Sequence, residues 1–183
     1  MQLTRKICLA FLLLASPPAH AATAQFTVDS KRNVQRFYGV PIDLTLARVK
    51  SLPFRVKIGE EMGEGDMYPV ARIQAQGGIE IKASFGLNGK LYYLESSDPK
   101  AVGPKGIRAG SLLSDVKAAW PTKKLIYGLA DGRFATFPTG TNVLYVFDPS
   151  ELPSQAFDVG AAKIVVPNIK VKSIRMFALF SDE

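Results

Sequence analysis

The sequence predicts an α+β fold, in which one domain combines a mostly antiparallel β-sheet with two short helices. Two patterns carry this prediction. Short segments with alternating apolar and polar residues, separated by Gly- and Pro-containing turns, fill most of the chain, as is typical of antiparallel strands. Two other segments repeat apolar residues every three or four positions, which indicates amphipathic helices. The composition, 47% apolar and 21% charged over 183 residues, is that of a globular protein.

The first 21 residues have the features of a bacterial secretory signal peptide. Arg5 and Lys6 form a positive n-region, residues 7–15 form an uncharged apolar run, and the A-x-A sequence at 19–21 predicts the cleavage site. The apolar run is well short of the ~20 residues that span a bilayer, and no later segment reaches that length. We therefore expect a mature chain of residues 22–183, a single α+β domain without a transmembrane segment, in the periplasm or outside the cell.

Processing would remove the only cysteine, Cys8, and the only histidine, His20. The mature chain would then have no Ser-His-Asp triad, cysteine nucleophile or His/Cys zinc site, and we expect no cofactor. Carboxylate, lysine, tyrosine and hydroxyl chemistry remains open. The formal net charge of +7 becomes +5 when Arg5 and Lys6 leave. This moderate charge is compatible with acidic envelope partners and does not indicate nucleic acid binding.

The first half of the mature chain predicts one helix and a β-meander. A strand at 25–28 is followed by a helix that Asp43 caps and Pro53 ends. Its apolar face is formed by Leu46, Val49 and Leu52. The expected strands are 54–58, 68–75, 79–85 and 91–95, with an acidic loop at 60–66, a two-residue turn at Gly77-Gly78 and a turn at 86–89.

The second half repeats this order. A helix capped by Gly110 or Ser111 and ended by Pro121 presents one apolar face, formed by Leu113, Val116 and Trp120. The strands expected after it are 123–127, 133–137 and 143–147. A polar connection at 148–161 leads to strands at 163–166 and 169–180. The apolar parity changes near Ile174, which predicts a β-bulge there.

An offset of 67 residues aligns two stretches of the chain. Leu46 then matches Leu113, and Val49 matches Val116. This match predicts an internal repeat of 39–95 and 106–147, with two helix-then-sheet halves that share one core. Chance is the alternative, because Gly, Leu, Val and Pro are common residues.

Two stretches resemble small secreted bacterial envelope proteins that belong to families of unknown function. The stretches are EGDMYPVARI and GIRAGSLLSDVKAAWP, and the resemblance extends over residues 37–147. It implies a periplasmic location and a fold, without an activity. Some such proteins carry a lipid-anchoring cysteine or a cysteine pair, and the mature chain would have neither.

Three groups of residues could carry chemistry. The acidic loop 60–66 could bind Ca²⁺ through Glu60, Glu61, Glu64 and Asp66, but its spacing is not that of an EF-hand, which favours a solvated hairpin loop. Glu80 and Glu95 lie in strands near aromatic residues, where paired carboxylates could hydrolyse a glycan, or they simply face outward. Ser114-x-x-Lys117 has the spacing of a serine nucleophile motif, but the accompanying motifs are absent, which favours a structural role.

A basic stripe near the C-terminus is the remaining candidate. It consists of Lys170, Lys172 and Arg175, with no acidic residue between Asp158 and Asp182. These residues could bind an anionic glycan, a lipid head group or an acidic protein, or they could protect an edge strand from aggregation.

The sequence therefore predicts a non-enzymatic periplasmic binding or accessory protein of the cell envelope, with no catalytic or metal residues assigned. The alternative is a carboxylate-based hydrolase that acts on cell-wall glycan. Two convergent acids about 5–9.5 Å apart in one pocket would favour the hydrolase.

Overall fold

Alternating apolar and polar segments form a curved antiparallel sheet in this computed structural model, which describes residues 26–130, 132–158 and 165–178. Within the described residues the sheet has eight strands in the order β4-β5-β6-β7-β11-β10-β9-β8. The strands are β4 (Arg55–Gly63), β5 (Asp66–Gln74), β6 (Glu80–Phe85), β7 (Leu91–Ser96), β8 (Ile126–Ala130), β9 (Gly132–Pro138), β10 (Val143–Phe147) and β11 (Val171–Phe177). The predicted antiparallel α+β fold is confirmed. The predicted signal peptide lies outside the described residues.

The strand order is palindromic. Four strands, β4 to β7, follow the first helical segment, and four more, β8 to β11, follow the second. The last strand of each set, β7 and β11, pair with each other in the middle of the sheet. The second set therefore extends to Phe177, beyond the end of the predicted repeat at residue 147.

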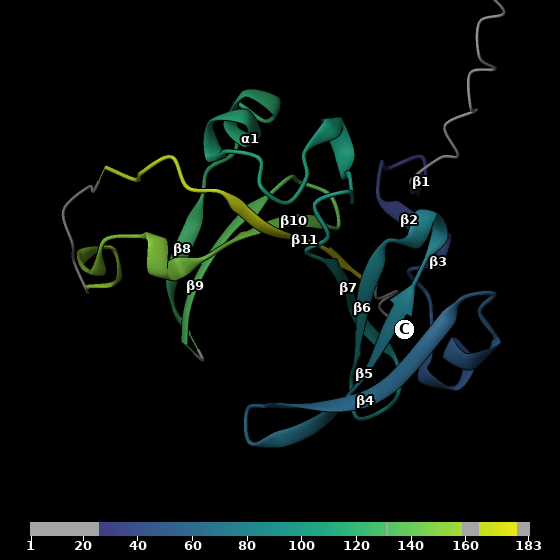
Figure 1. Cartoon of the computed structure of the whole chain (residues 1–183). Helices are drawn as coiled ribbons and strands as arrows, with labels where there is room; N and C mark the ends of the chain where they lie inside the picture. Colours follow the sequence, from purple (N-terminus) through teal and green to yellow (C-terminus); the bar gives the residue numbers. More distant parts are fainter. Residues whose placement is uncertain (1–25, 131, 159–164, 179–183) are drawn as a thin grey trace, which may run out of the picture.

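The two helical segments pack on one face of the sheet. The first is a 3-10 helix, η1 (Leu46–Ser51), and the second is the α-helix α1 (Leu113–Ala119). Val49 and Val116 are completely buried in the core, and Leu113 is 1% exposed. Figure 1 shows α1 above the convex side of the arched sheet. Burial of these apolar side chains stabilises the fold by about 25 cal/mol for each Å² of apolar surface removed from water, and this holds the two layers together.

The predicted helix caps are wrong. The residue before η1 is Thr45, the residue before α1 is Leu112, and neither side chain caps its helix. A residue distant in the sequence caps α1 instead: Asn168 Oδ1 accepts a hydrogen bond from the Ser114 backbone N–H at 2.9 Å. Asn168 lies just before β11, so this contact connects the helix to the central strand. Capping rules that consider only neighbouring residues cannot predict such a partner.

Three short strands near the N-terminus form a second sheet: β1 (Phe26–Val28), β2 (Val34–Phe37) and β3 (Val40–Pro41). Only β1 is predicted from the sequence. Asn142 attaches this sheet to the main one, since its side chain accepts the Val34 N–H at 2.8 Å and donates to the Phe177 carbonyl at 3.1 Å. Among the helices of the described residues, none is both long and apolar enough to cross a membrane.

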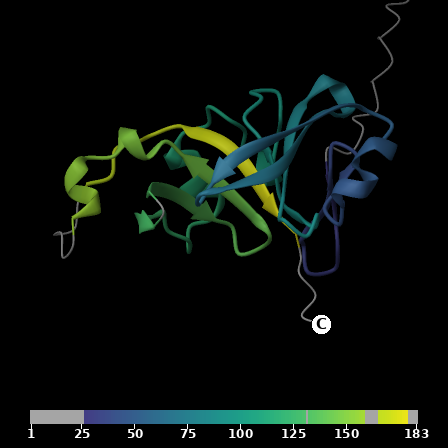
Figure 2. The same cartoon turned by 90° about the horizontal axis from the view of Figure 1, so that it is seen from below.

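The predicted acidic loop at 60–66 is wrong, because most of it belongs to strands. β4 and β5 form one long hairpin in which Gly63 pairs with Asp66. The two residues between them have positive φ angles, 52° at Glu64 and 89° at Gly65. This is the type I′ geometry that tight hairpins prefer. Figure 2, seen from below, shows the β4–β5 hairpin extending across the underside of the sheet.

Two further details differ from the prediction. The 76–78 connection is a 3-10 turn, η2 (Gln76–Gly78), and not a two-residue turn. The predicted bulge exists, but it lies at Lys172, where Ser173 pairs with Val146 and Val171 pairs with Phe147. The predicted strand 163–166 falls partly outside the described residues, and residues 165 and 166 form no strand.

Candidate binding face

The concave side of the sheet is the candidate site. A row of directly paired residues crosses seven strands there, and cross-strand partners share a face. The row consists of Lys57, Arg72, Lys82, Glu95, Arg175, Leu144 and Pro138. The core residues Ile81, Leu94 and Ile174 point to the other side, where the helices lie. We call the concave side the open face, because within the described residues no helix packs on it (Figure 1).

Ion pairs occupy the middle of the open face. Arg175 Nη2 lies 3.1 and 3.2 Å from the two carboxylate oxygens of Glu95, and the Ser173 hydroxyl donates to the same carboxylate. The Arg175 guanidinium also stacks 4.2 Å from the centre of the Tyr93 ring. On the neighbouring strands, Glu61 accepts from Lys82 at 2.8 Å and from Arg72 at 3.2 Å. These contacts fix the charged side chains in one arrangement.

The structure places the two candidate hydrolase residues in one pocket of about 210 Å³. Glu80 is bonded to Arg72 at 3.4 Å, and Glu95 to Arg175. The lining residues are Arg72, Glu80, Lys82, Glu95, Ser97, Lys172 and Ser173. A glycosidase acid usually needs an apolar environment that favours its protonated form. This lining, which is polar and holds cations, does not provide one.

The predicted basic stripe is divided between different partners. Lys172 Nζ lies 3.1 Å from Asp148 Oδ2, and Arg175 is bound to Glu95. Lys170 has an exposed side chain, and its backbone forms an isolated β-bridge with Leu112. The Ser150 hydroxyl and backbone N–H, together with Lys172, lower the pKa of Asp148 to about 2. Two of the three predicted cations are therefore balanced by acids.

The acidic residues of the hairpin do not converge. Glu60 pairs with Pro69 and Glu61 with Tyr68, so the two carboxylates leave the strand on opposite faces. Among the described residues, no group of three or more acidic, histidine or cysteine side chains is arranged to hold a metal ion.

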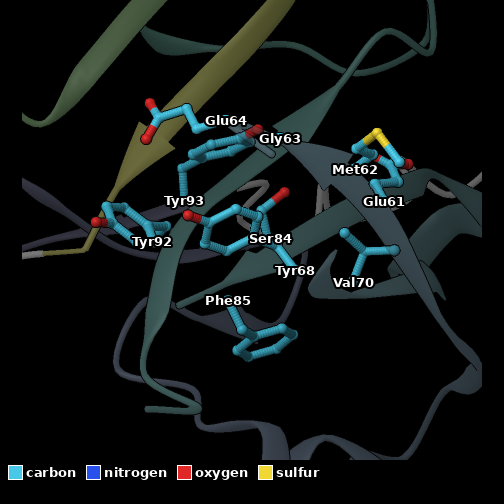
Figure 3. Close-up of a pocket in the computed structure, with 10 residues that line it drawn as sticks. All are labelled: Glu61, Met62, Gly63, Glu64, Tyr68, Val70, Ser84, Phe85, Tyr92 and Tyr93. Atoms are coloured by element: carbon cyan, nitrogen blue, oxygen red, sulfur yellow. The ribbon is translucent and has the colours of Figure 1, made fainter. Parts of the chain in front are cut away.

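A second pocket of about 290 Å³ lies where the β4–β5 hairpin faces β6 and β7, and we call it the tyrosine pocket (Figure 3). Its lining residues are Glu61, Met62, Gly63, Glu64, Tyr68, Val70, Ser84, Phe85, Tyr92 and Tyr93. The Tyr68 ring lies over Gly63, where a Cβ would be in ordinary van der Waals contact with it at 3.4 Å. Desolvation, followed by the charges of Asp66 and Glu64, raises the pKa of Tyr68.

Sequence reasoning missed the tyrosine pocket. Its residues come from three separate segments, and their proximity depends on the outer part of the β4–β5 hairpin, residues 60–66, which the sequence suggested to be a loop. One signal was present, because Tyr68 and Val70 alternate along β5 with residues of the opposite face.

The β8–β10 half of the open face is apolar. Ile126 is 50% exposed, and Phe134, Leu144 and Val146 are partly exposed. Their cross-strand pairing places Ile126 opposite Thr136, and Val146 next to the same threonine on the other side. The open face thus combines an apolar half, a central ion-pair network and the tyrosine pocket.

The fold and this face define a two-layer α+β protein with one open sheet surface. No protein-family model and no curated protein matches the chain. Among solved structures, it is similar to the crystal structure of the uncharacterized protein yfeY from Escherichia coli. That likeness has a TM-score of 0.52 and 16% sequence identity, and it covers 82% of this chain and 99% of the other. It shows a shared fold.

Proposed function

We propose that this chain is a non-enzymatic periplasmic binding or accessory protein of the bacterial cell envelope, and that it binds a protein partner through the open face. Residues 1–21, with their n-region, apolar run and A-x-A site, support export. The observation that carries the binding proposal is the open face itself, a wide sheet surface with partly exposed apolar and aromatic side chains.

The size of the open face suits a protein partner. Strands lie about 4.8 Å apart and rise about 3.3 Å per residue, so eight strands of about six residues cover roughly 700 Å². Stable protein–protein interfaces bury about 800 Å² on each partner. A small ligand would cover only part of this surface.

The composition of the open face also suits a protein partner. Interface cores are enriched in aromatic residues, Met and Arg. The open face presents Tyr93, Phe134 and Arg72. The β4–β5 hairpin beneath it adds Met62, which is 79% exposed. Hydrophobic residues exposed in this concentration mark interaction surfaces more often than scattered single residues do.

The same arrangement favours binding over the alternative, a cell-wall hydrolase. Glu80 and Glu95, the carboxylates suggested for that activity, are both engaged by guanidinium groups. The aromatic side chains line the tyrosine pocket and not the pocket of these two acids.

We also propose that the two halves of the sheet arose by duplication. The palindromic strand order and the equivalent burial of Val49 and Val116 support this origin. The central β7–β11 pair would then lie on the pseudo-two-fold axis. Superposition of η1 with β4–β7 on α1 with β8–β11 tests this proposal, and it fails if Val49 and Val116 do not coincide.

A capture experiment tests the proposed function. The tagged protein is expressed with its leader, purified from the cell envelope with its partners, and weighed intact to test for cleavage after Ala21. Ile126→Arg places a charge in the apolar half of the open face, and Leu87→Arg places the same charge at an exposed position on the β6–β7 turn. A partner retained by wild type and Leu87→Arg but lost by Ile126→Arg supports the proposal. Equal recovery with both variants, or release of cell-wall fragments by the pure protein, contradicts it.

A further inference from the structure

The tyrosine pocket has a negative charge that no cation of the described residues neutralises. Of its two acids, Glu61 is bound by Arg72 and Lys82, but Glu64 forms no ion pair in the described part of the chain. Glu64 sits at the tip of the β4–β5 hairpin, and Asp66 follows two residues later. Both carboxylates act on the Tyr68 hydroxyl at the pocket wall. An anionic ligand would be repelled here, and a cationic one attracted.

A buried hydroxyl in the same pocket lacks a hydrogen-bond partner. Ser84 is only 9% exposed, and within the described residues its Oγ has no partner. Figure 3 shows this hydroxyl pointing toward the space that the lining residues enclose. Buried polar atoms are almost always hydrogen-bonded, so an unpaired one that faces a pocket marks a point where a ligand group can bind. A cation with N–H groups would supply the donor that this oxygen needs.

The aromatic lining favours the same kind of ligand. Tyr68, Tyr92 and Tyr93 contribute rings to the pocket. Aromatic rings attract ammonium and guanidinium groups through their negative faces, as the Arg175 guanidinium on Tyr93 already illustrates in this protein. The rings and the Val70 side chain also provide an apolar wall for an alkyl chain.

We propose that the tyrosine pocket binds a primary ammonium group at the end of a short alkyl chain. Glu64 neutralises its charge, Ser84 Oγ accepts one of its N–H groups, and the tyrosine rings contact the chain. The pocket volume of about 290 Å³ is at the small end of ligand sites, which suits a group the size of a lysine side chain. Such a group could belong to a free amine or to a lysine of a protein partner.

The test is an NMR titration of the mature protein with n-butylammonium, compared with n-butanol and butyrate. We expect saturable shifts at Tyr68 and Ser84 with butylammonium, and affinity about tenfold weaker or undetectable with the neutral and anionic analogues, because a charge-assisted hydrogen bond is lost. A tripeptide with a central lysine separates the two sources. Tighter binding of the peptide than of butylammonium assigns the site to a protein side chain, and equal or weaker binding assigns it to a free amine.

Two variants make the proposal falsifiable without unfolding the protein. Glu64→Gln should weaken butylammonium binding about tenfold, whereas Glu60→Gln, which removes the same charge from the same hairpin outside the pocket, should leave it unchanged. Ser84→Ala should bind several-fold more weakly and still melt at the same or a higher temperature, because it removes an unpaired buried hydroxyl.

Three results overturn the proposal: butylammonium does not bind the wild type, Glu64→Gln and Glu60→Gln bind it equally, or butyrate competes for the same residues. These titrations contain no protein partner. Their failure would therefore leave the protein-binding proposal for the open face intact, and failure of the capture experiment would leave the pocket intact.

Discussion

Arg175 and Glu95 face each other at the centre of the sheet, where β11 and β7 join the two halves of the protein. They are direct cross-strand partners, and a single guanidinium nitrogen lies within hydrogen-bond distance of both carboxylate oxygens. The side chains are 27% and 16% exposed, so water screens this pair less than a surface pair. The position matters because β7–β11 is the one strand pair that connects β4–β7 to β8–β11 within the described sheet.

We predict that Arg175→Gln destabilises the protein by about 1–2 kcal/mol, because it leaves the largely buried Glu95 carboxylate without its cation. The measurement is the free energy of unfolding from urea denaturation. Lys170→Gln removes one charge from an exposed site nearby and should cost less than about 0.5 kcal/mol. Equal stability of the two variants would show that the central pair contributes nothing.

The buried valines of the two helical segments allow a second prediction. Val49→Ala and Val116→Ala each remove side-chain volume from a completely buried position and should each cost about 1–3 kcal/mol. The same urea experiment measures both values. The control is Lys117→Ala on the exposed face of α1, which should have little effect on stability. A cost below about 0.5 kcal/mol for either valine would contradict the assigned packing.

Much of the fold could be predicted because local patterns determine it. Strand β10 begins and ends at the predicted residues, and β7 ends one residue later than predicted. Helix α1 ends two residues before Pro121, the residue predicted to end it. Alternation with period two and turn residues such as those at 86–89 depend only on neighbours in the sequence. The tight turn of the β4–β5 hairpin was missed because Glu64, a residue uncommon at positive φ, occupies the position where Asn or Gly would signal a type I′ turn.

The candidate site could not be predicted for a different reason. Whether Lys172 and Arg175 are free cations depends on Asp148 and Glu95, which come from other strands and connections. Likewise, the tyrosine pocket exists only because one hairpin folds over two strands that are distant in the sequence. Pairing between strands decides both features, and a one-dimensional pattern does not contain it.

The pKa of Asp148 gives a prediction about acid stability. Its folded value of about 2 is below the ordinary value of 3.8, so the folded state binds its proton less readily than the unfolded state. The stabilisation from Asp148 is therefore complete above about pH 4 and is lost as the pH falls from about 4 to about 2. Urea unfolding of the wild type and Asp148→Asn should differ most at pH 6 and converge at pH 2. A difference that does not change with pH would contradict this assignment.

The basic residues near the C-terminus allow a final prediction about partner binding. Lys170 is exposed and forms no ion pair among the described residues, whereas Arg175 is held by Glu95. Lys172 is also exposed but is paired with Asp148, so Lys170 is the member of the stripe most available to an acidic partner or surface, and Lys172 contributes less. Replacing both lysines with Gln should slow association with any captured acidic partner and leave thermal stability nearly unchanged, because exposed charges contribute little to folding. Association of the wild type should also slow with added salt, since the Debye length falls from about 10 Å at 0.1 M to about 3 Å at 1 M. Stopped-flow or surface-binding kinetics measure both effects.

The matched control is the double variant Lys31→Gln/Lys50→Gln, which removes two exposed charges near the other end of the chain. If that control and the double lysine variant associate at the same rate, the two C-terminal lysines do not guide a partner. The suggested protection of an edge strand is wrong, because β11 pairs with β7 on one side and β10 on the other.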